Sequence, residues 1–179
     1  MNYCMECGTK LELRHLENEG EIPFCSQCNQ FRFPIFNTAV SMICIDVKNQ
    51  KILLIKQYGR PDYILVAGYI SRGEDAEAAV KREVFEETGV HIKDITYYKS
   101  QPWGYDGNVL MGFFAKLDGN RKITMDEDEL SVAEWVNYKD VPDDEEKISL
   151  TREMMTYFRK ERENESKRRE NKCNESIRQ

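Results

Sequence analysis

Three glutamates on one short stretch have the clearest capacity for chemistry in this sequence. Glu83, Glu86 and Glu87 stand at positions i, i+3 and i+4, so on a helix their side chains converge on one face. At about 100° per residue, Ala79 and Val80 project to the same side. The carboxylates therefore extend an apolar stripe, and because burying unpaired carboxylates is costly, a positive partner must lie among them.

Hard divalent cations are the partners that such carboxylates favour. Mg²⁺ and Mn²⁺ take oxygen ligands, and Mg²⁺ is commonly held by one or two carboxylates together with substrate phosphates. Arg82 lies beside Glu86 and could brace a carboxylate through a two-point hydrogen bond. The loop 68–73 begins and ends in glycine, which lets the backbone approach a ligand closely. The alternative reading is a solvated helix that is merely rich in glutamate.

Four cysteines form a second cluster with the spacing of metal ligands. Two residues separate Cys4 from Cys7 and Cys25 from Cys28, and residues 8–24 lie between the pairs. This spacing predicts a zinc site of four thiolates, whose closed tetrahedral shell leaves no position for substrate. We expect a structural Zn²⁺, since so small a segment cannot form a sufficient core alone.

The strands that must position these groups are predicted from apolar runs. They fall at residues 38–47, 52–55, 63–66, 92–98, 109–117 and 132–136. The first two flank a polar turn, which predicts a hairpin, and Gly68 is expected to end the third.

Two helices complete the expected elements. The first runs from about Asp75 to Thr88, where Gly89 can adopt the left-handed cap geometry. The second begins near Ile148, with Met155 and Phe158 on the same side. Strands, a central helix, more strands and a closing helix predict helices packed on a mixed sheet, an α/β fold.

Composition predicts a small acidic protein with three zones. Its 179 residues carry 26 Lys and Arg against 32 Asp and Glu, a net charge of −6. Residues 1–36 form the cysteine-bearing segment, 37–160 the main domain and 161–179 a charged tail, read as a solvated helical extension or, alternatively, a nucleic-acid contact. No run approaches the roughly 20 apolar residues of a membrane helix, and the start lacks a secretion signal. A cytoplasmic protein without a membrane partner is therefore expected.

The glutamate segment resembles the Nudix family. The family's box runs Gly, five residues, Glu, seven residues, then a segment that reads Arg-Glu-Val-Phe-Glu-Glu-Thr-Gly-Val here. The matching positions are Gly68, Glu74, Arg82, Glu83, Val84, Glu86, Glu87, Gly89 and Val90. The resemblance implies a Nudix α/β/α sandwich in which glutamates of the box bind metal and the arginine orients the helix. It also implies hydrolysis of a nucleoside diphosphate linked to another group.

A second array resembles the mark of NADH pyrophosphatases within that family. Their pattern is Ser-Gln-Pro-Trp-Pro-Phe-Pro, one variable residue, then Ser, and the first four positions agree at residues 100–103. The differences are Gly104 and Asp106 for proline, Tyr105 for phenylalanine and Asn108 for serine. The lost prolines predict a more flexible loop.

The resemblance implies which residues bind substrate. Gln101 and Trp103 belong to the array, and Tyr69, directly after Gly68, occupies the position of an aromatic that stacks on a ring of the dinucleotide. Packing at the core or its rim is the alternative for Trp103 and for Tyr69. Glu129 stands six residues before an aromatic, where the family has a further metal ligand or base.

The ribbon placed directly before a Nudix domain is also typical of this subfamily. Many members carry an extra N-terminal domain that this sequence does not show, and its features are not transferred. The subfamily forms homodimers in which the neighbouring chain completes the pocket, and Phe33 corresponds to an aromatic that could stack across the interface; simple packing is the alternative. Residues 1–36 hold three Lys or Arg against five Glu, so a nucleic-acid backbone would be repelled there.

These features predict a Mg²⁺- or Mn²⁺-dependent hydrolase that cuts NADH, NAD⁺ or a related dinucleotide into two mononucleotides. The alternatives within the enzyme class are another nucleoside diphosphate derivative, such as ADP-ribose, or NAD-capped RNA. A different class is a sensor that binds a dinucleotide without cutting it, and the unbroken set of box glutamates argues against it.

Overall fold

The computed structural model of the chain describes residues 2–104, 107–142 and 149–177, with side chains in the last helix described as far as residue 168. The chain divides into two compact units, Met1–Phe36 and Asn37–Gln179. Within the described ranges, no helix is both long enough and apolar enough to cross a membrane.

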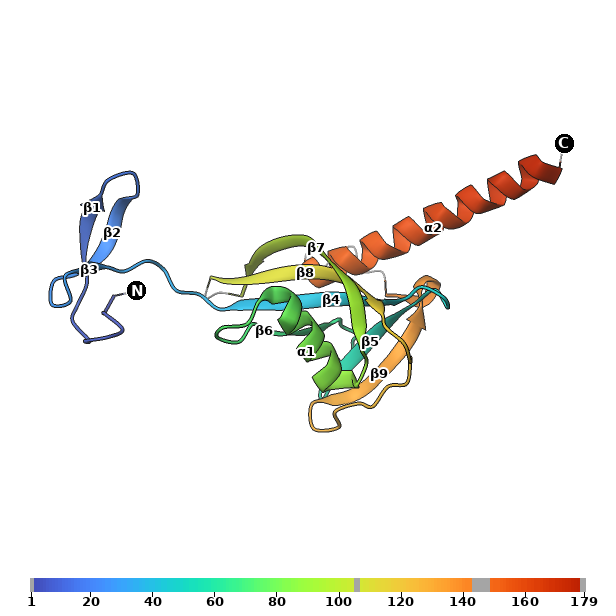
Figure 1. Cartoon of the computed structure of the whole chain (residues 1–179), viewed down its shortest axis with the longest axis horizontal. Coiled ribbons are helices and arrows are strands. Elements are labelled where there is room, and N and C mark those ends of the chain that lie inside the picture. The colour runs from blue at the N-terminus through green and yellow to red at the C-terminus, as the bar shows by residue number, and fades with distance from the viewer. Residues whose placement is uncertain (1, 105–106, 143–148, 178–179) are drawn as a thin grey trace. The chain divides into compact units, whose positions relative to one another are not determined.

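The first unit is a small antiparallel sheet. Its strands, in the order β1-β2-β3, are β1 (Glu12–Leu16), β2 (Gly20–Cys25) and β3 (Gln30–Phe31) (Figure 1). Its buried apolar residues are few, and Phe24 packs edge to face on Phe31 with ring centroids 5.0 Å apart. So small an apolar core needs a further source of stability.

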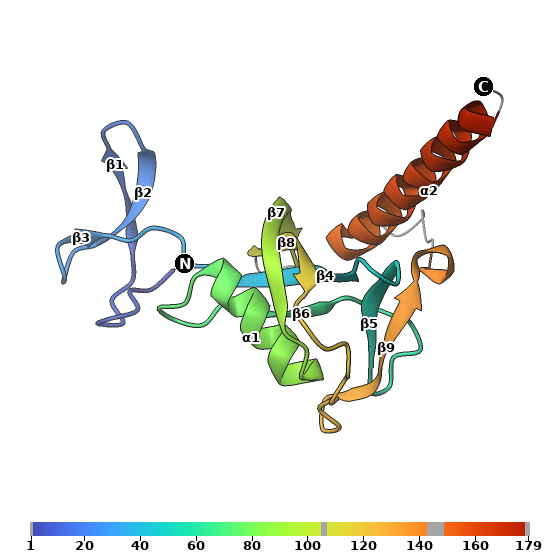
Figure 2. The ribbon, with the colours of Figure 1, turned by 45° about the vertical axis from the view of Figure 1, so that its right-hand side comes forward.

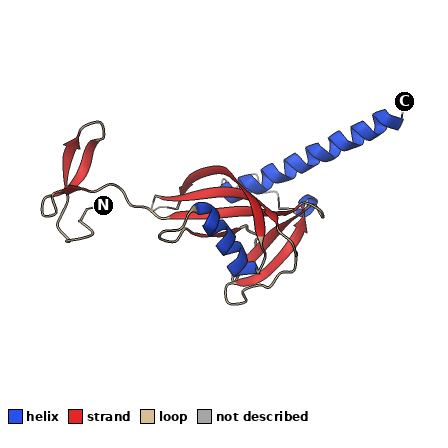
Figure 3. Ribbon diagram, in the orientation of Figure 1, coloured by secondary structure: helices blue, strands red, loops and turns tan. Residues whose placement is uncertain are grey.

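The second unit is built on a mixed sheet (Figure 3). Its strands are β4 (Thr38–Asp46), β5 (Lys51–Gln57), β6 (Val66–Tyr69), β7 (Ile92–Trp103), β8 (Asn108–Leu117) and β9 (Leu130–Asn137). The order is β7-β8-β4-β5-β9, and β6 pairs with β4 beside this path. Strands β4 and β8 run parallel and the other pairs antiparallel, so the hairpin predicted for β4 and β5 is confirmed.

Two helices cover opposite faces of this sheet (Figure 2). Helix α1 (Ala76–Thr88) packs on the face that carries Val40 and Met42, and α2 (Leu150–Ile177) packs on the face that carries Ile43. A short 3₁₀ turn, η1 (Tyr138–Asp140), follows β9. The α/β/α arrangement confirms the predicted fold class.

The ends of α1 follow the predicted signals. The side chain of Asp75 caps the start by accepting a hydrogen bond from the backbone N–H of Ala78 at 2.8 Å. Gly89 ends the helix at φ 67°, and its N–H donates to the carbonyl of Phe85 at 2.8 Å. The predicted helix is confirmed at both ends.

The third predicted strand is displaced along the chain. Ile64 makes only an isolated bridge to Ile55, and β6 begins at Val66 and continues through Gly68. The prediction that Gly68 ends the strand is wrong, because this glycine adopts extended backbone and pairs with Val40. Because Gly68 has no side chain, Glu83 of α1 can lie directly against the backbone of β6.

Strand β7 is longer than predicted and continues to Trp103, with two shifts in its register against β8. Residues 100–103 of the array are therefore strand and not loop. Tyr105 and Asp106 lie outside the described residues.

Helix α2 packs closely because β8 offers a glycine beneath it. A Cβ on Gly112 would stand 2.6 Å from Sδ of Met154. Met155 and Phe158 are buried on the same helix, as predicted, whereas Ile148 falls outside the described part. The helix continues through the predicted tail boundary at 160 to Ile177.

Candidate active site

Arg82 is the central hydrogen-bond donor of the glutamate segment. Its Nε and Nη2 donate to the two carboxylate oxygens of Glu74, both at 2.8 Å. Its Nη1 donates to Glu83 at 2.8 Å and to Glu86 at 2.9 Å. Nη2 also donates to the carbonyl of Tyr69 at 3.0 Å. The expected two-point bond is made to Glu74, and these hydrogen bonds lower the pKa of that carboxyl to about 2.

Glu83 lies directly against the backbone of β6. A Cβ on Gly68 would stand 1.9 Å from Cδ of Glu83 and 2.2 Å from each of its carboxylate oxygens. Only glycine at this position leaves room for the carboxylate. Burial raises the pKa of Glu83, although the hydrogen bond from Arg82 opposes the rise.

Glu87 is a buried carboxylate with one oxygen that accepts no hydrogen bond from the described residues. The residue is 6% exposed, and its Oε2 has no hydrogen-bond partner among the described residues. Burial, followed by the charges of Glu83 and Glu129, raises the pKa of Glu87 to about 8. A buried oxygen of this kind fits a cation, which would stabilise the ionised form.

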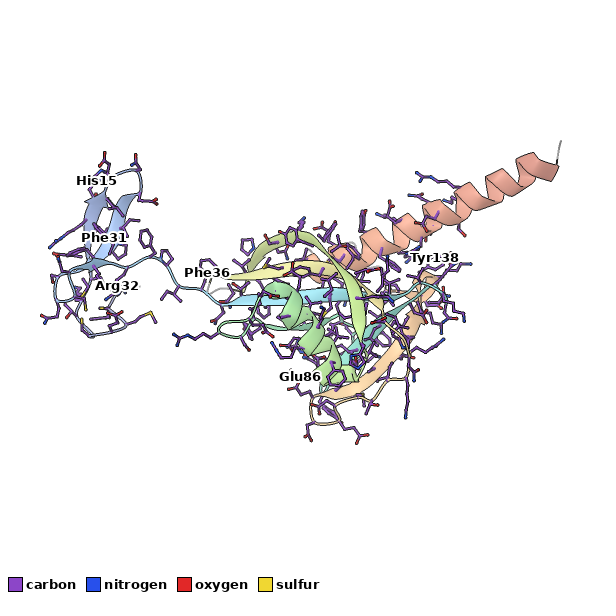
Figure 4. The ribbon with its side chains drawn as sticks, in the orientation of Figure 1. His15, Phe31, Arg32, Phe36, Glu86 and Tyr138 are labelled. Carbon is purple, nitrogen blue, oxygen red and sulfur yellow. The ribbon has the colours of Figure 1, made fainter. Side chains whose placement is uncertain are left out.

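The prediction that all three glutamates continue the buried stripe holds for Glu87 and largely for Glu83, but is wrong for Glu86. The side chain of Glu86 is 58% exposed, and Figure 4 shows it on the C-terminal part of α1. Consecutive residues lie about 100° apart around a helix, so Glu86 points to the rim when Glu87 points to the core. Phe85 is also exposed.

Glu129 is the last residue of the loop before β9, and this loop lies against the end of α1 that carries Glu87. The N–H of Asp126 donates to the carbonyl of Glu87 at 2.9 Å, which ties this loop to the last turn of α1. The charge of Glu129 raises the pKa of both Glu83 and Glu87. The structure therefore brings Glu129 near the box glutamates, and its side chain is exposed.

The glutamates are spread more widely than the ligands of a closed metal site. Across residues 2–104, 107–142 and 149–168, only the four cysteines form a group whose ligand atoms all lie within 4.8 Å of one another. Arg82 holds Glu83 and Glu86 through hydrogen bonds. The donor set is nevertheless all oxygen, with an unpartnered atom on Glu87, and this chemistry fits Mg²⁺ or Mn²⁺.

Three of the predicted substrate-binding residues, Tyr69, Gln101 and Trp103, share the face of the sheet that α2 covers, whereas Gly68 meets Glu83 on the face of α1. Register places Tyr69 opposite Ala39, Ala39 opposite Leu110, and Leu110 opposite Gln101. The rings of Tyr69 and Trp103 have centroids 6.0 Å apart with planes inclined at 51°. They are 50% and 42% exposed, so core packing does not account for either ring.

The four cysteines converge as predicted. The sulfurs of Cys4 and Cys28 lie 3.9 Å apart, and those of Cys7 and Cys25 lie 3.5 Å apart. A tetrahedral zinc with Zn–S bonds of about 2.3 Å would separate its sulfurs by about 3.8 Å. The geometry therefore fits one metal ion held by four thiolates.

Both cysteine pairs turn in the same way. Gly8 follows Cys7 at φ 72°, and Asn29 follows Cys28 at φ 53°. Glycine and asparagine tolerate this left-handed backbone best. Asn29 was missed from the sequence, although its place directly after a cysteine pair could have marked it.

Two further residues near the site were given no role in the sequence analysis. Glu74 holds the guanidinium of Arg82, and its place in the box could have indicated this. Tyr58 donates from its hydroxyl to the carbonyl of Glu127 at 2.9 Å and so anchors the loop that carries Glu129; nothing in the sequence marked it. Phe33 belongs to the first unit, where it is half exposed, and its contact with substrate stays a prediction.

A mixed sheet between two helices, with an arginine that braces several glutamates beside a glycine, defines a domain suited to cation-dependent chemistry on phosphates. Residues 36–165 match the model of the NUDIX domain, and the chain belongs to the Nudix hydrolase family. This match agrees with the resemblance of the box residues and with the fold.

Among relatives, the chain is 34% identical over 146 residues to the NAD-capped RNA hydrolase NudC of Vibrio parahaemolyticus, covering 79% of this chain and 53% of that protein. It spans about half the length of the curated relatives it matches.

Among solved structures, a NUDIX hydrolase from Nitrosomonas europaea superposes with a TM-score of 0.69 at 22% identity, covering 92% of this chain and 93% of that one. The NUDIX domain of Shewanella oneidensis NrtR, complexed with ADP ribose, gives a TM-score of 0.51 at 18% identity and covers 66% of this chain and 80% of that one. At these identities both likenesses concern the fold.

Proposed function

We propose that this chain hydrolyses the diphosphate bond of NADH, NAD⁺ or a related dinucleotide and releases two mononucleotides. The observation that carries the proposal is the position of Tyr69. Its ring faces Trp103 on an exposed surface, while its carbonyl is bound by the same Arg82 that holds Glu83. A ring that can stack on substrate therefore follows directly along β6 from Gly68, which Glu83 contacts, although the ring and the carboxylates lie on opposite faces of that strand.

The four carboxylates share one part in this reaction, and the residues around them position the carboxylates and the substrate. Glu83, Glu86, Glu87 and Glu129 would hold Mg²⁺ or Mn²⁺. When bound, such a cation stabilises charge on the diphosphate oxygens and activates water. Arg82 keeps Glu83 and Glu86 in place through its two hydrogen bonds. Gly68 provides the space that Glu83 occupies, and Gln101 lies in the same row of the sheet as Tyr69, where it can orient substrate.

The proposal is tested by incubating the purified protein with NADH and Mn²⁺ and measuring the mononucleotides released. We expect Glu86→Gln to fold normally and lose turnover, because Glu86 is largely exposed and its carboxylate is needed only for metal. Glu77→Gln, on the exposed face of the same helix, is the matched control. An unchanged rate in Glu86→Gln would refute the role assigned to it.

Two other substrates are favoured by particular findings. The relatives named as NAD-capped RNA hydrolases favour a dinucleotide attached to RNA, and the NrtR domain complexed with ADP ribose favours a smaller ligand. A panel of NADH, NAD⁺, ADP-ribose, NAD-capped RNA and nucleoside triphosphates ranks them by kcat/KM. Binding of a dinucleotide without release of any product would instead indicate a sensor.

We also propose that the first unit is a zinc ribbon of the kind found in NADH pyrophosphatases, with Cys4, Cys7, Cys25 and Cys28 as ligands. Reduced thiolates of this kind suit a cytoplasmic location. A homodimer in which Phe33 of one chain stacks on substrate bound to the other belongs to the same proposal. Sedimentation of the protein, together with the KM for NADH of Phe33→Ala, tests it.

A further inference from the structure

A cavity lies at the other end of the sheet from the aromatic pair of Tyr69 and Trp103. It has a volume of about 510 Å³ and opens at the end of β4, around the turn that leads into β5. Asp46 lines it, six residues along β4 from Val40, the partner of Gly68. At about 3.3 Å per residue, it lies about 20 Å from the place where Glu83 meets the strand.

Four cationic side chains from four different segments line this cavity. They are Lys48 in the β4–β5 turn, Lys93 at the start of β7, Lys116 near the end of β8 and Arg121 in the loop that follows. The chain as a whole is acidic, with a charge of −6. Asp46 in the lining and the partners Asp94 and Asp118 offset part of this charge, so the local formal charge is +4 − 3, or +1. This local excess of positive charge contrasts with the acidic chain, and screening over about 8 Å keeps its potential local.

Asp46 is the only carboxylate among the residues that line the cavity, and it is already hydrogen-bonded within the β4–β5 turn. Asp46 is buried, and its two oxygens accept hydrogen bonds from Asn49, from the backbone N–H at 3.1 Å and from Nδ2 at 2.6 Å. Nη1 of Arg121 lies 3.9 Å from Oδ2 of the same carboxylate, which makes a long ion pair.

Two of the lysines have carboxylate partners at the rim. Lys93 pairs with Asp118 at 2.8 Å and Lys116 with Asp94 at 3.1 Å. All four side chains are more than half exposed, and exposed pairs of this kind contribute only about 0 to 1 kcal/mol. An anion with several charges can therefore bind both lysines, because breaking their two ion pairs costs little free energy.

We propose that this cavity binds a small multivalent anion of the polyphosphate class, separate from the glutamate site. Compact ammonium groups and a planar guanidinium around one hollow suit the several oxygens of linked phosphates. The site needs neither Mg²⁺ nor Mn²⁺, because the protein itself supplies the positive charge. The proposal does not rest on the proposed hydrolysis of dinucleotides.

The probe is inorganic triphosphate, titrated calorimetrically into protein freed of Mg²⁺ and Mn²⁺ with its zinc retained. We expect Lys48→Glu and Arg121→Glu each to weaken binding by about tenfold or more. Lys81→Glu, an exposed reversal on α1 with the same change in net charge, should weaken it by less than about twofold. Amide shifts of residues 46–49 and 119–121 in NMR spectra should move with triphosphate.

The proposal would be overturned if triphosphate fails to bind the unchanged protein at millimolar concentration, or if the cavity variants bind no worse than Lys81→Glu. Shifts confined to α1 and the loop before β9 would assign the anion to the glutamate site and overturn it as well. Glu86→Gln should bind triphosphate normally, which separates this result from any failure of hydrolysis.

Discussion

The buried carboxylate of Glu87 lowers the stability of the protein when no cation is bound beside it. Burial, followed by the charges around it, raises the pKa of Glu87 from its ordinary value of 4.5 to about 8. The unfolded chain therefore ionises this group at lower pH than the folded protein does, and stability falls as pH rises from about 4.5 to about 8. At pH 7 the folded protein still holds the proton on Glu87, whereas the unfolded chain has released it, and at about 1.4 kcal/mol per pH unit this difference opposes folding by about 3 kcal/mol.

Replacing Glu87 by Gln removes the charge and keeps the shape of the side chain. We expect the free energy of unfolding of the Mg²⁺- and Mn²⁺-free protein to rise by about 2 to 3 kcal/mol at pH 7, with little change at pH 4.5. The expected gain is below the full cost because the amide of Gln is itself a buried polar group, and the position of Oε2 offers it no hydrogen-bond partner among the described residues. Turnover should be lost together with the stabilisation that Mn²⁺ gives the unchanged protein.

The assay is urea denaturation at several pH values, with and without Mn²⁺, and with zinc kept bound. Glu77→Gln is the control, since Glu77 lies on the exposed face of the same helix and should change stability by less than about 0.5 kcal/mol. A Glu87→Gln variant that is less stable than the unchanged protein at pH 7 would contradict this cost. So would a free energy of unfolding that depends on pH in the same way in both proteins.

Three other changes have defined outcomes. Gly68→Ala places a Cβ 1.9 Å from Cδ of Glu83, so turnover should fall by about 100-fold or more while thermal denaturation shows a folded protein; full activity would contradict the role of this glycine. Gly112→Val drives side-chain atoms into Sδ of Met154 and should lower the free energy of unfolding by about 1 to 3 kcal/mol in urea; an unchanged midpoint would count against close packing of α2. Arg32, which directly follows β3 and is labelled in Figure 4, makes a two-point ion pair with Glu6, between Cys4 and Cys7. Arg32→Ala removes this ion pair and should speed the loss of zinc to a chelator; equal release rates would contradict this expectation.

Signals that act over short distances along the chain allowed good predictions. Asp75 and Gly89 cap α1 because their side chain and backbone contact groups only three or four residues away. The spacing of Glu83 and Glu87 likewise fixes their common face. The convergence of the four cysteines could be predicted because zinc sites use a small set of spacings.

Features that depend on contacts between distant segments were missed or misplaced. Gly68 has the signature of a strand end, and only the arrival of Glu83 from α1 shows why a glycine lies inside β6. Glu86 follows the same helical spacing as Glu83 and Glu87, but the buried face of α1 is too narrow to include it, and its side chain is exposed. The meeting of Tyr69 with Trp103 depends on the pairing of β6, β4, β8 and β7, which no local pattern encodes.

The most direct test of the account is a crystal structure of the protein grown with Mn²⁺ and measured for anomalous scattering. The account predicts at least one Mn²⁺ within about 2.5 Å of carboxylate oxygens from the set Glu83, Glu86, Glu87 and Glu129, with Glu87 among the ligands. Glutamate oxygens turned to solvent, with no anomalous peak between α1 and the loop before β9, would contradict it.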